Sequence, residues 1–189
     1  MKVQPIRDVE IIHEIEKSLS EEKSNKGRRK YLMFECGIYL ARRVCDVLPM
    51  QVGDLRGKTH IRIKEKKTKK VIELPIPLHL QRFIKRELRG VSDDEFIFTS
   101  RQHDKNGSLK PISYKTAYNY MKEIADDMGL PYNIATHTMR KTFGYHYYKR
   151  TKDIATLMVL FNHHTEKDTK IYIGIELDEI TAAVQNFKY

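Results

Sequence analysis

Several stretches of this chain carry residue types that handle phosphate and protons. His137 and Arg140 stand three positions apart in HTMR, so on a helix both side chains would share one face within a turn of each other. One guanidinium can donate two hydrogen bonds to a single phosphate, and an imidazole exchanges a proton near neutral pH. The pair alone does not define a site, because this spacing occurs by chance and a histidine often caps or packs.

The stretch FNHHTEKDTKIYIGI, residues 161–175, has two adjacent histidines and, nine positions after the first, Tyr172. It is open to three interpretations: a metal site, a packed helix end, or a nucleophile with a phosphate-binding partner. A zinc site requires three or four His, Cys or carboxylate ligands. His163, His164 and Glu166 are candidates, but adjacent histidines point in different directions and no cysteine stands nearby. We therefore expect no metal here.

Basic residues are concentrated in the first half of the chain. Arg43 and Asp46 are three apart, so the carboxylate could orient the arginine, although an ordinary surface helix pair is the alternative. Residues 56–70 hold eight lysines and arginines against a single glutamate, Glu65. Such a segment repels itself unless it meets an anion. This favours contact with phosphates over a merely solvated turn.

The overall composition indicates the same class of partner. The 189 residues suit one domain, or at most two small ones. With 35 lysines and arginines against 25 acidic residues the net charge is +10, which favours nucleic acid over the alternative of a merely basic cytosolic protein. Cys36 and Cys45 form neither a disulfide framework nor a CxxC metal motif. No signal peptide or membrane span is recognisable, so we expect a cytoplasmic protein.

Hydrophobic periodicity predicts a mainly α fold with a small antiparallel β-hairpin, an α+β arrangement. The hairpin covers residues 60–77 and has a lysine-rich tip, whereas residues 101–111 have the composition of a loop. Helices are predicted over residues 8–19, 24–41, 43–51, 78–90, 114–129, 137–150, 154–162 and 178–187. The N-caps expected for four of them are Asp8, Ser113, Thr136 and Asp153.

Taken in chain order, these candidates resemble the signature of the tyrosine recombinases, also called phage-type integrases. The first arginine box of that family, typically GLRxxEL, corresponds to ARRVCDV at 41–47. The HxLR[HK] box corresponds to HTMRK at 137–141, the LGH box to FNH at 161–163, and the T-x-x-Y box to TKIY at 169–172. The resemblance covers about residues 8–187, with all boxes in order and at fitting separations.

Two positions of this resemblance depend on a choice among neighbours. Ala41 and Arg42 replace the Gly-Leu of the family, so Arg42 competes with Arg43 for the role of the first arginine. The hairpin lysine of the family lies in a KTxK-like tip before a proline-containing strand end. Among the crowded tip lysines, Lys67 is selected because of its distance to Pro75.

The resemblance implies site-specific recombination, with DNA strand cleavage and rejoining through a 3′-phosphotyrosyl intermediate. Tyr172 would be the nucleophile, because it follows the box of the second histidine at the usual nine-residue distance. A phenol with a pKa of about 10 is a poor nucleophile at neutral pH and needs help with its proton. His137 would be the base or its relay, and Lys67 would protonate the leaving 5′-oxygen.

The phosphate would be held by Arg43, Arg140 and His163, which would stabilise the charge that builds up in the transition state. Asp46 would lie behind them and orient the arginine and the histidine. The lysines expected to contact DNA are Lys64, Lys66, Lys69, Lys70 and Lys141.

The resemblance further implies double-stranded DNA as the partner, no metal and no cofactor. The two strand exchanges imply a tetramer on paired DNA sites, and the protein free of DNA can still be a monomer. We expect one catalytic domain over residues 1–189, without the N-terminal core-binding domain that family members usually carry. Such a protein would be bacterial or phage-encoded, cytoplasmic and nucleoid-associated. A non-catalytic DNA-binding regulator on the same fold and a type IB topoisomerase are the alternatives.

The predicted last helix, residues 178–187, carries apolar residues on one face. Such a stripe must be buried. It can pack on its own domain or, as the resemblance implies, dock on a neighbouring protomer. The residues of the stripe are Ile180, Ala183, Val184 and Phe187.

Overall fold

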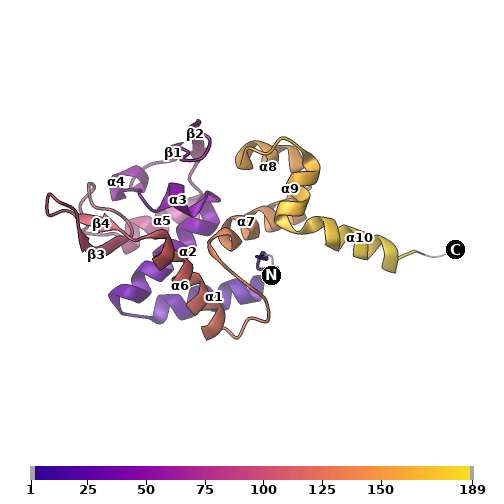
Figure 1. Cartoon of the computed structure of the whole chain (residues 1–189), viewed down its shortest axis with the longest axis horizontal. Helices are drawn as coiled ribbons and strands as arrows, with labels where there is room; N and C mark the ends of the chain where they lie inside the picture. Colours follow the sequence, from indigo (N-terminus) through magenta and orange to yellow (C-terminus); the bar gives the residue numbers. More distant parts are fainter. Residues whose placement is uncertain (1–2, 188–189) are drawn as a thin grey trace.

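The computed structural model describes residues 3–187, which form a mainly helical molecule with two small antiparallel hairpins (Figure 1). This confirms the predicted α+β fold class. The helices are α1 (Val9–Glu21), α2 (Asn25–Leu40), α3 (Val44–Val47), α4 (Val52–Leu55), α5 (Leu78–Glu87), α6 (Tyr114–Asp127), α7 (Thr136–Thr151), α8 (Ile154–Phe161), α9 (Glu166–Ile173) and α10 (Ile175–Gln185). The strands are β1 (His60–Lys64), β2 (Val71–Pro75), β3 (Thr99–His103) and β4 (Leu109–Pro111). None of the helices in this range is long and apolar enough to cross a membrane.

Capping side chains explain where several helices begin. Asp8, Ser113 and Asp153 each accept a hydrogen bond from a backbone N–H in the first turn that follows, as the sequence predicted. Thr136 is instead the first residue of α7, and Ala135 precedes it in the cap position. Short polar side chains therefore set three of the four predicted helix starts.

Other predictions about the elements were wrong. The predicted helix over residues 43–51 is shorter than its range: α3 ends at Val47, just before Pro49, and the next helix, α4, begins only at Val52. Residues 101–111, predicted as a loop, include the end of β3 and all of β4, and the loop is confined to residues 104–108 between these strands. The sequence did not predict α9, whose first turn is capped by the hydroxyl of Thr165.

The β1–β2 hairpin has an apolar face and a basic face. Its strands pair with Ile61 opposite Leu74 and Ile63 opposite Ile72. Both isoleucines of β1 are buried in the main core, whereas His60, Arg62 and Lys64, which alternate with them, are exposed. This alternation anchors the base of the hairpin and leaves its lysine-rich tip at the surface.

Two hydrophobic clusters hold the described part of the chain together. The larger one draws on α1 to α6, β1 and the start of α7. α7 contacts α2 on one side and α8 and α9 on the other, so its first turns lie where the two clusters meet. The smaller cluster consists of Ala41, Tyr145, Tyr148, Leu157, Phe161, Ile173 and Ile175.

Two glycines let α7 approach its neighbours closely. A Cβ at Gly37 of α2 would lie 2.2 Å from the Met139 sulfur. A Cβ at Gly144 would lie 2.6 Å from Ile173 and 2.8 Å from Phe161. All of these distances are shorter than a van der Waals contact in a close-packed interior. Glycine at 144 therefore allows α8 and α9 to lie directly against α7.

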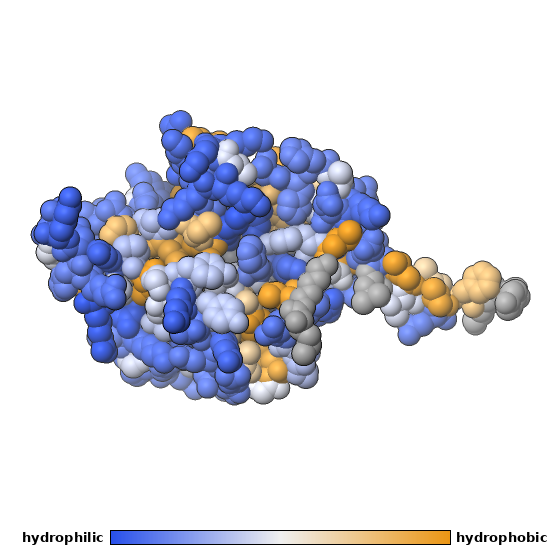
Figure 2. All heavy atoms as spheres, in the orientation of Figure 1, coloured by the Kyte–Doolittle hydropathy of each residue, from blue (hydrophilic) through white to orange (hydrophobic). Residues whose placement is uncertain are grey.

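The last helix leaves the main body of the molecule. α10 begins at Ile175, and not at Asp178 as the sequence predicted. It projects away from the other helices (Figure 1), and Figure 2 shows hydrophobic residues along the projection. Ile180, Val184 and Phe187 are 55%, 69% and 68% exposed. The apolar stripe therefore does not pack on its own domain.

We predict that Gly144→Ala destabilises the protein, because the added methyl group overlaps Ile173 and Phe161. Overpacking of this kind costs about 1–3 kcal/mol. Helix propensity alone would change stability in the opposite direction, by about 1 kcal/mol. Urea unfolding followed by circular dichroism measures the difference. Arg150→Ala, an exposed change on the same helix, is the control, and a stabilised Gly144→Ala variant would contradict the close approach.

Candidate active site

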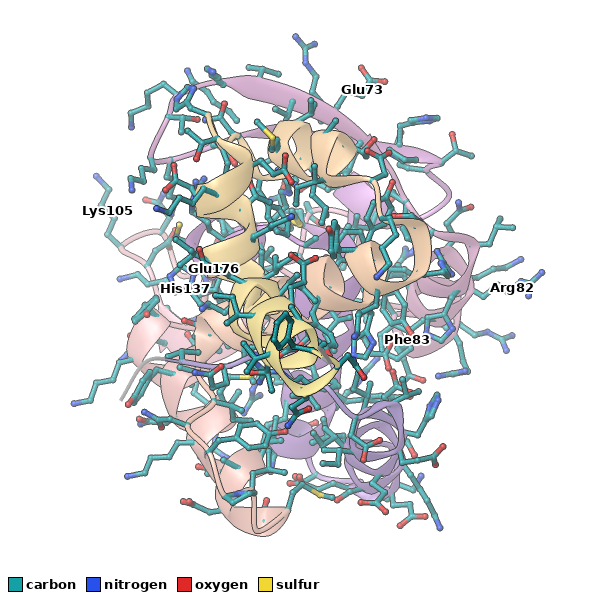
Figure 3. All side chains as sticks on the ribbon, turned by 90° about the vertical axis from the view of Figure 1, so that its right-hand side faces the viewer. Glu73, Arg82, Phe83, Lys105, His137 and Glu176 are labelled. Carbon is teal, nitrogen blue, oxygen red and sulfur yellow. The ribbon has the colours of Figure 1, made fainter. Side chains whose placement is uncertain are left out.

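The predicted site residues converge from four parts of the chain. They lie just before α3, at the tip of the β1–β2 hairpin, on the first turns of α7, and between α8 and α9 and on α9 itself. Lys70 of the hairpin donates a hydrogen bond of 2.8 Å to Asn162 at the end of α8, and Figure 1 shows the hairpin opposite that helix. Figure 3 shows Glu73 and Lys105 at the periphery, pointing outward.

Arg140 is a buried cation with an unused donor. Arg140 is only 2% exposed. The central carbon of its guanidinium lies 4.5 Å from the centre of the Phe161 ring. One terminal nitrogen donates to the Phe161 carbonyl at 2.9 Å. The other, Nη1, is buried and has no hydrogen-bond partner among the described residues. Burial lowers the pKa of Arg140, but arginine remains charged in proteins, so the site is suited to an anion.

The structure separates the two candidates for the first arginine. The side chain of Arg42 is 1% exposed and that of Arg43 is 17% exposed. Arg42 donates to the backbone carbonyls of Leu40 and Leu160, so it ties α2 to α8. Burial lowers its pKa to about 10. Arg43 reaches the surface of the site, where its Nη1 donates to Glu65 at 2.9 Å. Arg43 is thus the arginine that can meet a ligand.

Tyr172 and His137 contact each other across α7 and α9. The phenol oxygen lies 3.3 Å from His137 Nδ1, and its ring lies 5.1 Å from the ring of His163. Burial raises the pKa of Tyr172, and the nearby Arg140 and Arg43 partly offset that increase. Desolvation and the charge of Arg140 lower the pKa of His137. A neutral imidazole is therefore positioned to accept the phenol proton at neutral pH.

His163 is held by the helix that carries the tyrosine. Its Nδ1 lies 3.2 Å from the Thr169 hydroxyl, which itself donates to the Thr165 carbonyl at 2.9 Å. Nδ1 is therefore the donor in this pair, which orients the ring and turns Nε2 toward other partners. Asn162 precedes it with φ 51°, a left-handed conformation that asparagine tolerates. His164 is exposed.

The hairpin lysines differ in exposure from the one on α7. Five lysines at the hairpin tip are exposed: Lys64, Lys66, Lys67, Lys69 and Lys70. Lys141 is instead buried, and its ammonium group donates to the Val3 carbonyl and lies over the Tyr172 ring. The structure therefore places Lys141 under the tyrosine and not at the surface, where we expected it to contact DNA.

Asp46 also has a different set of contacts from the one expected. Its Oδ1 accepts from the backbone N–H of Lys66 at 2.8 Å, and the Cys45 thiol lies 3.7 Å away. Its Oδ2 is buried without a hydrogen-bond partner among the described residues. Asp46 therefore holds the hairpin tip and does not directly bond the arginine or the histidine.

Sequence reasoning missed two contributors to the site. Glu65 is completely buried between the arginines, although the segment around it is strongly basic. Thr169 orients His163, and the helix that carries it could have been found from Thr165 and Asp168, which form a local capping pattern. No local pattern indicates the burial of Glu65. Among the described residues there is no group of three His, Cys, Asp or Glu side chains that could hold a metal ion.

Known proteins share both the sequence and the fold. The model of the phage integrase family matches residues 9–177. The chain is 42% identical over 185 residues to the "Probable integrase/recombinase YoeC" of Bacillus subtilis, covering 98% of this chain and 97% of that protein. It is 26% identical over 145 residues to the "Tyrosine recombinase XerA" of Pyrococcus furiosus, covering 76% of this chain and 49% of that protein.

Two solved structures give the same fold at lower identity. A crystal structure of XerA recombinase superimposes with a TM-score of 0.70 at 15% sequence identity. The aligned region covers 100% of this chain and 68% of the XerA chain. The crystal structure of XerH in a post-cleavage complex with its palindromic difH substrate gives a TM-score of 0.69 at 20% sequence identity. The aligned region covers 98% of this chain and 54% of the XerH chain. The family match over most of the chain and the 42% identity to YoeC decide the assignment. This chain belongs to the phage integrase family, the tyrosine-type site-specific recombinases.

Proposed function

We propose that this protein cuts and rejoins double-stranded DNA through a covalent bond between Tyr172 and a 3′-phosphate. The observation that carries the proposal is one cluster of groups: the Tyr172 phenol on His137, beside an Arg140 nitrogen that has no partner among the described residues. A nucleophile, a proton acceptor and an anion-binding donor thus lie side by side, which is the arrangement that phosphoryl transfer requires.

The proposed cleavage step forms a bond between the Tyr172 oxygen and phosphorus and breaks the bond to the 5′-oxygen. The phenol proton passes to His137, and Lys67 donates a proton to the leaving 5′-oxygen. Arg43 and Arg140 hold the non-bridging oxygens while negative charge builds up on them. Rejoining is the reverse step, in which a 5′-hydroxyl attacks the phosphotyrosine. The phosphodiester energy is conserved in the covalent intermediate, so the two halves of the reaction balance.

His163 provides a further donor in this proposal. Its Nδ1 proton is engaged with Thr169, so donation from Nε2 to a phosphate oxygen requires the charged imidazolium. The neighbouring Arg140 and Arg43 lower the pKa of His163, after the larger effect of burial. The negative charge of a bound phosphodiester would oppose these positive charges and favour the imidazolium.

The apolar stripe on α10 supports assembly of several protomers on DNA. Ile180 and Val184 on this helix and Phe187 just after it are exposed, and the helix projects from the molecule (Figure 2). The lambda integrase has been solved as a tetramer bound to a Holliday junction. We infer that α10 of one protomer docks on a neighbour in a tetramer, and that residues 1–189 act as one catalytic domain. The match to nearly all of YoeC supports that domain organisation.

The proposed nucleophile is tested by covalent trapping. A pool of nicked duplexes with a randomised core lets a short 5′-hydroxyl fragment diffuse away after cleavage, so the adduct accumulates and identifies the site. Tyr172→Phe removes the attacking oxygen and should abolish the adduct while DNA binding stays nearly unchanged. Tyr118→Phe, an exposed tyrosine on α6, is the matched control. An undiminished adduct in Tyr172→Phe would rule Tyr172 out, and wild-type binding without any adduct would favour a non-catalytic regulator.

The pH dependence of trapping tests the role of His137. Its pKa is lowered from the usual 6.5, and the neutral form is the base, so titration of His137 should not change the second-order rate of adduct formation near pH 7. The rate should fall only below pH 6.5, approaching about tenfold per pH unit. His137→Gln should be slow and lack this acidic limb, whereas His164→Gln should keep it. An unchanged limb in His137→Gln would assign the titration to another group.

The role of α10 is tested by deleting residues 180–189. This truncation removes the exposed stripe but keeps Glu179, which accepts from the Tyr148 hydroxyl at 3.0 Å. We expect a folded protein that binds DNA, forms smaller complexes on paired sites and cleaves without normal regulation. Size-exclusion chromatography with DNA and the trapping assay measure both effects. Val159→Ser, at a residue that is 80% exposed on α8, is the control. Wild-type complex size after truncation would exclude docking through this helix.

A further inference from the structure

We propose that Glu65 is a positioning residue, which fixes the turn carrying Lys67 against Arg43 so that the lysine can protonate the leaving 5′-oxygen. The inference rests on the proposed function and extends it to a residue outside the recombinase boxes. Glu65 is the only carboxylate in the basic segment 56–70.

Glu65 joins the hairpin to the arginines with both of its carboxylate oxygens. Oε1 accepts from Arg43 at 2.9 Å and lies 3.6 Å from Arg42. Oε2 accepts from the Thr68 hydroxyl at 2.6 Å. The side chain is 0% exposed, so these contacts are made away from water, where charge-assisted hydrogen bonds are stronger. One side chain therefore links the residue after Lys67 to a phosphate-binding arginine.

The backbone of the turn is closed around the same residue. Glu65 N–H donates to the Lys70 carbonyl at 2.9 Å, and Lys69 N–H donates to the Glu65 carbonyl at 2.9 Å. Lys69 has a φ of 61°, the left-handed conformation that lets the chain reverse. Asp46 accepts from the backbone N–H of Lys66 at 2.8 Å. The residues on both sides of Lys67 are thus fixed by carboxylates.

The charge of Glu65 is maintained by its surroundings. Burial alone would raise its pKa, but the Thr68 hydroxyl and the Arg43 and Arg42 guanidiniums together lower it below the usual value. Glu65 is therefore ionised at neutral pH. A neutral amide at this position could still accept one hydrogen bond, but would not hold two guanidiniums and a hydroxyl together with comparable strength.

A purely structural role for Glu65 predicts a different outcome. If it only neutralised the buried Arg42, its loss would weaken folding or DNA binding and would slow cleavage whatever the leaving group. If it positions Lys67, its loss slows only cleavage that needs a proton on the leaving oxygen. A leaving thiolate separates these cases, because a thiol with a pKa of about 8.5 departs without protonation, whereas an alkoxide does not.

The experiment compares single-turnover cleavage of two nicked duplexes with the site identified by trapping. One carries the ordinary phosphodiester, and the other carries sulfur in place of the bridging 5′-oxygen. Glu65→Gln, Thr68→Val and Lys67→Ala should each slow cleavage of the oxygen substrate by about ten- to a hundredfold. All three should return to within about threefold of wild type on the sulfur substrate, as expected when only general-acid catalysis is lost.

Two comparison variants make the result decisive. Arg43→Ala should stay slow on both substrates, because phosphate binding is needed for either leaving group. Glu73→Gln removes an exposed carboxylate from the same hairpin, which Figure 3 shows pointing outward, and should behave like wild type.

The possible results separate this inference from the proposed function. Equal losses on both substrates for Glu65→Gln and Thr68→Val, or no loss on the oxygen substrate, would overturn the positioning role. If Glu65→Gln does not fold, Thr68→Val decides, because it removes only the hydroxyl at the hairpin tip. If the sulfur substrate restores cleavage by Lys67→Ala but not by Glu65→Gln and Thr68→Val, Lys67 remains the general acid, and the proposal that Glu65 positions it is rejected. Absence of a wild-type adduct on both substrates would instead overturn the proposed function, and this inference with it.

Discussion

Positive charge concentrated in a largely buried site is the constraint that organises this molecule. Arg42, Arg43 and Arg140 surround Glu65, and burial lowers the pKa of Arg42 and Arg140. Guanidiniums removed from water destabilise the folded state unless anions and hydrogen-bond acceptors compensate. Glu65 and backbone carbonyls at the ends of α2 and α8 supply part of that compensation. The remaining Arg140 donor leaves the site suited to one more anion, such as a phosphodiester.

The same arginine cluster affects both the packing and the ionisation of Tyr172. Arg140 packs against the rings of both Phe161 and Tyr172, so the cation and the proposed nucleophile share one aromatic wall. Burial disfavours the phenolate, and the nearby guanidiniums oppose that effect. The close approach of α9 to α7, which Gly144 permits, brings the phenol to His137. Packing in the smaller core and proton transfer at the site are thus parts of one arrangement.

The proposed catalytic groups and the proposed assembly surface occupy different parts of the chain. The site groups lie before α3, at the hairpin tip, on α7 and around α9, whereas the exposed apolar residues at the C-terminal end project away from them. Only Gly174 separates α9 from α10. A force on the projecting helix would therefore reach Tyr172 through very few residues, which gives a short physical route from assembly to the nucleophile.

The sequence alone determined the residue types of the site, most helices and the basic hairpin, because periodicity, capping residues and motif spacing are local properties. It favoured Arg43 over Arg42 from motif position alone, but the exposure that separates them depends on which carbonyls the rest of the fold brings to each guanidinium. It placed Lys141 at the surface, whereas packing of α7 against α9 buries it beneath Tyr172. It missed the second hairpin, whose pairing joins residues on either side of a polar loop. Glu65 was counted as one negative charge among lysines. Only the tertiary structure, by folding the hairpin onto the start of α3, made it the buried partner of two arginines.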